Sequence, residues 1–203
     1  MSDRMYPPTR NLTSASHTIS EQAYGNGTYV TNQSTTYDTN ESPRNGWTAF
    51  NTSISSGPVF ANSQYNNGNG GNYITSKGQY LVDDYKGDWL TIELPVQINL
   101  TKYGFKQRGS PYGTRAPARY KIYGSNDGSS WTELVHKTSD ITYTGIDFEE
   151  SISDIGMYKH FGLVVNKLKD NDTMLNFDEW YIYGNEPDPE YYTGRSTNIP
   201  TMK

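Results

Sequence analysis

The stretch that most constrains the fold is a polar turn between two aromatic, strand-like runs. Tyr120–Tyr123 and Trp131–Val135 are rich in aromatic and β-branched residues, which suit a pleated sheet. Between them lies Asn126-Asp127-Gly128, and Asn and Gly tolerate the positive φ of tight turns. A phosphate loop would open a helix at this point, and a calcium loop would need acidic residues at alternate positions. The stretch therefore predicts a β-hairpin whose turn is only a bend.

Other segments extend the same pattern along the chain. Leu90, Ile92 and Leu94 alternate with polar residues until Pro95, which is the period of a half-buried strand. Further short strands are expected at Tyr103–Arg108, Ile146–Phe148, Phe161–Val165 and Trp180–Tyr183. No segment carries a sustained helical stripe. The spacing is that of a sandwich or barrel, and we expect one all-β sandwich over residues 21–184.

The two ends of the chain lack this alternation. Residues 1–20 and 185–203 are polar and contain Pro7, Pro8, Pro187, Pro189 and Pro200, so we expect an N-terminal and a C-terminal arm. Such segments bury too little apolar surface to order alone. We expect them to dock onto neighbouring subunits of an oligomeric assembly through Tyr6, Tyr191, Tyr192 and Ile199.

Composition excludes several classes of function. The net charge is −5 and the chain has no basic block, so nucleic acid is not an expected partner. No run reaches the roughly 18 apolar residues of a membrane span, and the N-terminal residues lack the apolar core of a signal peptide. The 203 residues include no cysteine, which leaves no disulfide or thiolate site. A soluble chain is the expectation.

The hairpin also carries a family resemblance. Ser125–Trp131 resembles the Ser-x-Asp-Gly-x-x-Trp hairpin of discoidin-like domains, which are also called coagulation-factor 5/8 type C domains and include the family 32 carbohydrate-binding modules. Further strands match in order over roughly residues 45–184, at Trp89–Pro95, Tyr103–Arg108, Tyr158–Val165 and Asp178–Gly184. Tyr6–Thr9 and Gln22–Tyr29 resemble the discoidin-like domains encoded by large DNA viruses of algae and protists.

The resemblance implies a discoidin-like jelly-roll β-sandwich with a ligand site in the loops at one end, often for a sugar. An arginine at the end of the second matched strand commonly takes sugar hydroxyls in the family, and Arg108 stands at that place; the alternative is an ion pair with a carboxylate. A guanidinium offers several donors, and an aromatic face can stack on a pyranose. Tyr112 is the nearest stacking candidate, with Trp47 and Tyr85 behind it. For Trp47 the alternative is a place in the core.

The family often holds one structural calcium ion between an early Ala-x-Asp-Gly loop and a late glutamate. Here Asn51 replaces the aspartate, while Glu179 is retained. Calcium prefers charged oxygen ligands, so the substitution predicts a weak or absent calcium site and otherwise no cofactor. Glu179 is then expected to accept backbone N–H bonds from the same loop.

Catalysis finds little support in the sequence. Adjacent acids occur at Asp83-Asp84, Glu149-Glu150 and Asp178-Glu179, but neighbours on a strand point to opposite faces. The histidines show neither a nucleophile elbow nor metal-ligand spacing.

Three functions remain open. The first is a non-catalytic module of a virion-type assembly, such as a minor capsid or surface component, which recognises a glycan or a neighbouring capsid-like protein. The second is a purely structural capsid or fibre component without a ligand. The third, the weakest, is a glycosidase. A virion is the expected location if the chain is viral.

Overall fold

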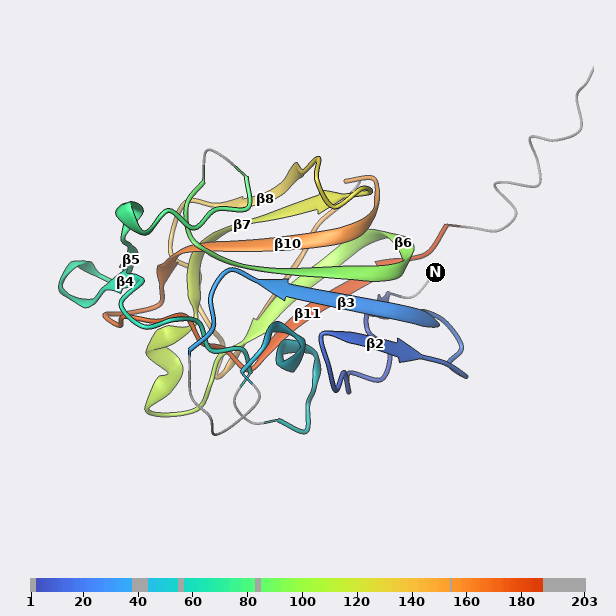
Figure 1. The fold of residues 1–203 in the computed structure, drawn as a ribbon, viewed down its shortest axis with the longest axis horizontal. Coiled ribbons are helices and arrows are strands. Elements are labelled where there is room, and N and C mark those ends of the chain that lie inside the picture. Colours follow the sequence, from blue (N-terminus) through green and yellow to red (C-terminus); the bar gives the residue numbers. More distant parts are fainter. Residues whose placement is uncertain (1–2, 38–43, 55–56, 83–84, 154, 188–203) are drawn as a thin grey trace, which may run out of the picture.

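The computed structural model describes residues 3–37, 44–54, 57–82, 85–153 and 155–187 (Figure 1). These residues form eleven strands and four short 3-10 turns, with no α-helix among them. No helix in this described part is long and apolar enough to cross a membrane. The elements run in the order β1 (Arg4–Met5), β2 (Ser16–Ile19), β3 (Gly27–Gln33), η1 (Gly46–Phe50), β4 (Tyr65–Asn66), η2 (Asn67–Asn69), β5 (Asn72–Tyr73), η3 (Thr75–Lys77), β6 (Asp88–Lys106), η4 (Tyr112–Arg115), β7 (Pro117–Ser125), β8 (Thr132–Lys137), β9 (Asp147–Ser151), β10 (Met157–Leu168) and β11 (Glu179–Asn185).

One long strand, β6, belongs to both layers of a sandwich. Its first half pairs with β3 and β10, and β10 pairs in turn with β7, which pairs with β8. Its second half pairs with β11 on one side and β9 on the other. All these pairs are antiparallel, so the chain forms the all-β sandwich that the alternation predicted, of the jelly-roll kind that the resemblance implied. The strand crosses between layers near Pro95, where Ile92 is paired with both β3 and β10 but Ile98 with β10 alone.

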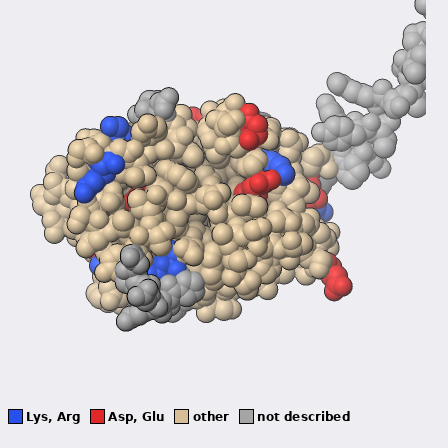
Figure 2. Space-filling view, viewed as in Figure 1, with Lys and Arg blue, Asp and Glu red and all other residues tan. Residues whose placement is uncertain are grey.

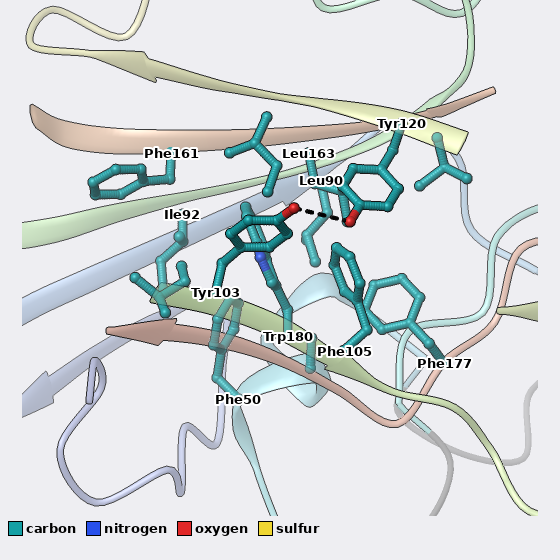
Figure 3. Packing of buried hydrophobic residues seen from close by; sticks show 14 of the residues in the cluster. Phe50, Leu90, Ile92, Tyr103, Phe105, Tyr120, Phe161, Leu163, Phe177 and Trp180 are labelled. Carbon is teal, nitrogen blue, oxygen red and sulfur yellow. Dashed lines mark hydrogen bonds between the residues drawn. The ribbon is translucent and has the colours of Figure 1, made fainter. Parts of the chain in front are cut away.

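The core lies between these layers. Tyr103, Phe105 and Trp180 of β6 and β11 lie opposite Tyr120, Phe161 and Leu163 of β7 and β10 (Figure 3). The hydroxyls of Tyr103 and Tyr120 are 3.1 Å apart and hydrogen-bonded. Burying two phenols this deeply would be costly without that partner. The aromatic richness of the sequence thus supplies the core.

The predicted hairpin is confirmed as β7 and β8. In the turn between them the Asp127 carboxylate accepts hydrogen bonds from the backbone N–H groups of Ser129 (2.8 Å) and Ser130 (2.6 Å). Gly128 has a φ of +71°, as the turn chemistry required. The polar side chains of this turn are therefore used to close the bend.

The N-terminal segment differs from the expectation of a separate arm. Residues 3–20 contribute β1, which pairs with β11, and β2, which pairs with β3. Tyr6, Leu12 and Ile19 are buried in the core of the same chain. The prediction for Tyr6 was therefore wrong: it anchors the segment within its own domain, where its hydroxyl donates to Glu186 over 2.9 Å.

The C-terminal arm was predicted to begin at residue 185, and Asn185 is the last residue of β11. Glu186 also accepts a hydrogen bond from the backbone N–H of Gly25. The remaining anchors, Tyr191, Tyr192 and Ile199, lie outside the described residues.

Candidate functional site

Arg108 lies two residues after the end of β6, and the structure brings it together with Tyr112. It begins a loop that contains a cis Ser110–Pro111 bond and leads into η4. The Arg108 guanidinium carbon lies 4.2 Å from the centroid of the Tyr112 ring. A cation over an aromatic face at an exposed site is stabilised by about 0.5–1 kcal/mol. Tyr112 therefore orients Arg108.

A carboxamide fixes the other side of Arg108. Its Nη1 donates to the Oδ1 of Asn176 over 3.1 Å, and Asn176 is fully buried. The Asn176 amide donates in turn to the Pro58 carbonyl over 2.9 Å. The direct partner is thus a neutral group rather than the carboxylate of the alternative interpretation. Within the described part of the chain, Nε and Nη2 of Arg108 make no hydrogen bond.

The charge balance around Arg108 includes a nearby carboxylate. Burial lowers the pKa of Arg108, while Asp178 acts in the opposite direction. Burial likewise raises the pKa of Asp178, against the field of Lys106 and Arg108. Arg108 and Asp178 each stabilise the charged form of the other, but they form no direct ion pair within the described residues.

Arg108 lines an open hollow of about 290 Å³ at this end of the sandwich. Gly109, Ser110, Pro111 and Thr114 form the loop side, and Gln107 and Lys169 form the opposite wall. Lys169 donates to the Gln107 side chain over 2.6 Å. We call this site the Arg108 hollow. Within the described residues, Nε and Nη2 of Arg108 are donors without a hydrogen-bond partner at this hollow.

The ring of Tyr112 is less available than the sequence suggested. A second guanidinium, that of Arg115, lies 4.9 Å from its centroid, and Arg115 is held by Asp172 at 3.0 Å. With 37% of Tyr112 exposed and two cations near its ring, it is better placed to position Arg108 than to stack on a sugar.

Trp47 and Tyr85 do not join this site. Trp47 lies in η1 with 8% exposure and packs in the core, so the core alternative describes it. Tyr85 lies on the outer face of β7 and β8, with its ring 5.6 Å from that of His136 and 4.8 Å from Nζ of Lys121. Within the described part of the chain, neither makes a hydrogen bond or a ring contact with Arg108 or Tyr112.

The expected calcium position holds an arginine. Nη2 of Arg10 lies 2.6 Å from Oε2 of Glu179, whose side chain is 3% exposed. Asn51 donates to the Leu12 carbonyl and accepts from the backbone N–H of Ser53. The expectation that Glu179 accepts backbone N–H bonds was wrong, because Arg10 is its partner. Burial still raises the pKa of Glu179 to about 7, with Arg10 opposing the shift.

Sequence reasoning missed Arg10 because it placed that residue in an arm. No local signal links positions so distant in the chain. Among the described residues, no group of three or more acidic or histidine side chains is arranged to hold a metal ion. A guanidinium supplies the positive charge beside Glu179 instead.

A hollow of about 690 Å³ lies on the outer face of β11, β6 and β9. We call it the tyrosine groove; it is lined by Arg10, Thr142, Thr144, Asp147, Phe148, Glu149, Tyr181 and Tyr183. Tyr181 donates to Asp147 over 2.9 Å, and Tyr183 donates to Glu149 over 2.8 Å. Burial, followed by these carboxylates, raises the pKa of both phenols.

The two phenols of the tyrosine groove are thus each bonded to one of its carboxylates. Lys102 holds the second oxygen of Glu149 at 3.0 Å. Glu150, the neighbour of Glu149, points to the opposite face and accepts from Tyr103 and Lys137, so this acid pair is divided between two faces as expected. The pair at 83–84 lies outside the described residues.

Comparison with known proteins bears on the fold. No family model and no curated protein matches the sequence. A solved structure of CpGH89CBM32-5 from Clostridium perfringens, in complex with GalNAc-β-1,3-galactose, aligns with a TM-score of 0.52 at 12% identity, covering 76% of this chain and 94% of that one. The family 32 carbohydrate-binding module of Clostridium perfringens NanJ, in complex with galactose, aligns with a TM-score of 0.52 at 9% identity, covering 90% and 99%.

The chain has the discoidin-like fold. Chitosan-binding module 1 of a Paenibacillus sp. IK-5 chitosanase/glucanase gives the same TM-score of 0.52 at 13% identity, covering 76% of this chain and 94% of that one. At such identities the likeness establishes the discoidin-like fold alone. The ligand has to be argued from the residues of this chain.

Proposed function

We propose that this chain is a non-catalytic module that binds a glycan through the Arg108 hollow. The observation that carries the proposal is the state of Arg108. One guanidinium nitrogen is fixed by Asn176 and the cation is oriented by Tyr112, while Nε and Nη2 keep their donors free of partners in the described residues. Preorganised donors at an open hollow suit vicinal sugar hydroxyls.

The structural neighbours agree with this ligand class. Two of them are recorded in complex with a galactose-containing sugar, and the third is a chitosan-binding module. The carboxylates of this chain also favour binding over hydrolysis. Glu149, Glu150 and Glu179 are each bonded to a tyrosine, lysine or arginine side chain.

The virion-type assembly expected from residues 6–9 and 22–29 stays a prediction, as do a capsid-like partner and a virion location. The N-terminal anchor Tyr6 is used within the chain, so an assembly role would have to rest on other surfaces.

A glycan array tests the proposal. Wild type should bind a subset of glycans, and Arg108→Ala should abolish that binding with little change in melting temperature. Arg119→Ala is the matched control, because Arg119 is a partly exposed arginine near the start of β7 that is paired with Asp140 and does not line the hollow. Unchanged binding by Arg108→Ala, or its unfolding, would contradict the proposal.

A further inference from the structure

A second polar hollow, of about 190 Å³, lies on the outer face of the layer that contains β3, β6 and β10. We call it the Trp131 hollow; its walls include Val30, Asn32, Glu93, Gly128, Trp131 and His160. Cross-strand register brings these residues together. Val30 is opposite Glu93 on one side of β6, and Glu93 is opposite His160 on the other.

Gly162 of β10 leaves room for the Trp131 ring to pack on the sheet. A Cβ added at Gly162 would lie 2.4 Å from the Leu81 side chain and 3.1 Å from the six-membered ring of Trp131. The six-membered ring of the indole therefore rests over Gly162, which is two residues after His160 in β10 and on the same face of the strand. With that end on the sheet, the partly exposed indole forms a wall of the hollow.

The polar groups of this hollow are unlike those of the tyrosine groove. Within the described part of the chain, the Asn32 amide, the His160 ring and the Trp131 indole N–H make no hydrogen bond. Glu93 bonds Lys159 through one oxygen at 2.7 Å, which leaves acceptor capacity on the carboxylate. Donors and acceptors thus converge without intramolecular partners.

The charge of the site favours a neutral ligand. Lys159 offsets Glu93, and burial lowers the pKa of His160, so the ring is neutral near pH 7. The face of the molecule seen in Figure 2 carries few charged side chains among uncharged ones. A phosphate or a metal ion would find no net opposite charge here.

An aromatic wall beside unpaired donors and acceptors matches the two sides of a pyranose. The volume equals that of about six water molecules at ~30 Å³ each, which suits one sugar unit rather than a chain. We propose that the Trp131 hollow binds one neutral sugar unit, stacked on Trp131, with its hydroxyls bonded by Asn32, Glu93 and His160. This site is separate from the Arg108 hollow and does not require it.

Saturation-transfer and ¹⁵N chemical-shift NMR with a panel of neutral methyl pyranosides test the proposal on the full chain. At least one pyranoside should shift backbone signals of residues 30–32, 91–93, 128–131 and 160–162. Asn32→Ala and His160→Ala should each weaken its binding about tenfold, as expected for one lost hydrogen bond to a ligand. Trp131→Leu, which keeps an apolar contact over Gly162, should weaken it at least as much.

Matched controls separate this site from general damage and from the first site. Asn67→Ala, in the exposed turn η2, and His136→Ala, on the same sheet face beside Tyr85, should bind the pyranoside as wild type does. Arg108→Ala should leave these shifts intact, so failure at one site is distinguishable from failure at the other. The proposal is overturned if no pyranoside shifts these residues, or if Asn32→Ala and His160→Ala both bind like wild type.

Discussion

The tyrosine groove and the Trp131 hollow show that the size of a cavity is a poor guide to its use. The tyrosine groove is the larger, at about 690 Å³ against about 190 Å³. Yet each of its phenols is bonded to one of its carboxylates and Arg10 is bonded to Glu179, so a ligand that used these groups would have to compete with existing hydrogen bonds. In the Trp131 hollow, the Asn32 amide, the His160 ring and the Trp131 indole N–H make no hydrogen bond within the described residues, so they can bond water or a ligand.

The difference has a physical origin in the strands. In the tyrosine groove, Gly104 of β6 lies between Tyr181 of β11 and Glu149 of β9. Because Gly104 has no side chain, the tyrosines of β11 can reach over β6 to the acids of β9, as Tyr181 does to Asp147 and Tyr183 does to Glu149. In the Trp131 hollow, Gly162 is instead covered by Trp131 and Leu81. The polar residues beside it are left facing the opening. The bonded side chains of the tyrosine groove therefore stabilise the fold, whereas the polar side chains of the Trp131 hollow are placed to bind a ligand.

The largest effect should come from the ion pair at the edge of the tyrosine groove. Arg10→Met leaves the Glu179 carboxylate buried without its cation, and we expect a loss of about 3 kcal/mol in the free energy of unfolding near neutral pH. Chemical denaturation measures it. Arg119→Met, which breaks the exposed pair with Asp140, should cost less than ~1 kcal/mol. Equal losses would mean that the groove is no more structural than the open surface.

The pH dependence of stability should carry the signature of the same carboxyl. The pKa of Glu179 is about 7 when folded, above its ordinary 4.5, so folding favours the protonated form. Its contribution to stability is full below the unfolded pKa and is lost as the pH rises through 7. Asp88, whose pKa burial raises to about 6, acts in the same direction between its ordinary 3.8 and 6.

Glu179→Gln isolates this contribution. Relative to wild type, the variant should gain about 3 kcal/mol in unfolding free energy between about pH 4 and about pH 8, since the raised pKa of Glu179 is about 2.5 units above its ordinary value and one pKa unit corresponds to ~1.4 kcal/mol. Denaturant melts at both pH values measure the difference. A constant difference across that range would contradict the raised pKa.

Removing one polar group from each hollow compares them directly. Tyr183→Phe deletes a hydrogen bond that the chain makes, and should lower the unfolding free energy by about 1 kcal/mol without changing sugar binding. Asn32→Ala deletes a side chain that makes no hydrogen bond within the described residues, and should leave the unfolding free energy within about 0.5 kcal/mol while weakening sugar binding. The opposite pattern would reverse the roles assigned to the two faces.

The smallest effect is expected from metal removal. Because Arg10 already supplies a positive charge to Glu179, a chelator should leave the melting temperature unchanged. Thermal melts with and without added calcium measure this. A clear rise in melting temperature with calcium would show that the ion displaces Arg10.

Several parts of this structure were readable in the sequence. The Asn126-Asp127-Gly128 turn predicted the β7–β8 hairpin, and the alternation at Leu90, Ile92 and Leu94 predicted the first half of β6. Both signals are local, because turn chemistry and period-two burial depend on neighbours in the chain.

What the sequence did not show depends on distant contacts. β1 and β2 have two and four residues, too few to display a period, so the N-terminal segment was interpreted as an arm. The pairing of Arg10 with Glu179 follows from that segment's docking. The Trp131 hollow requires the register that sets Gly162 beside Thr91, which no single-strand pattern encodes.

The most direct test of the account is a ¹⁵N chemical-shift map with the best glycan from the array, recorded on the full chain. The account predicts shifts at residues 107–114 of the Arg108 hollow, and at residues 30–32, 91–93, 128–131 and 160–162 of the Trp131 hollow if the glycan offers a neutral pyranose there. Residues 142–149 and 181–183 of the tyrosine groove should stay unshifted. Shifts confined to the tyrosine groove would contradict the claim that unpaired polar groups, rather than cavity size, mark where this chain binds sugar.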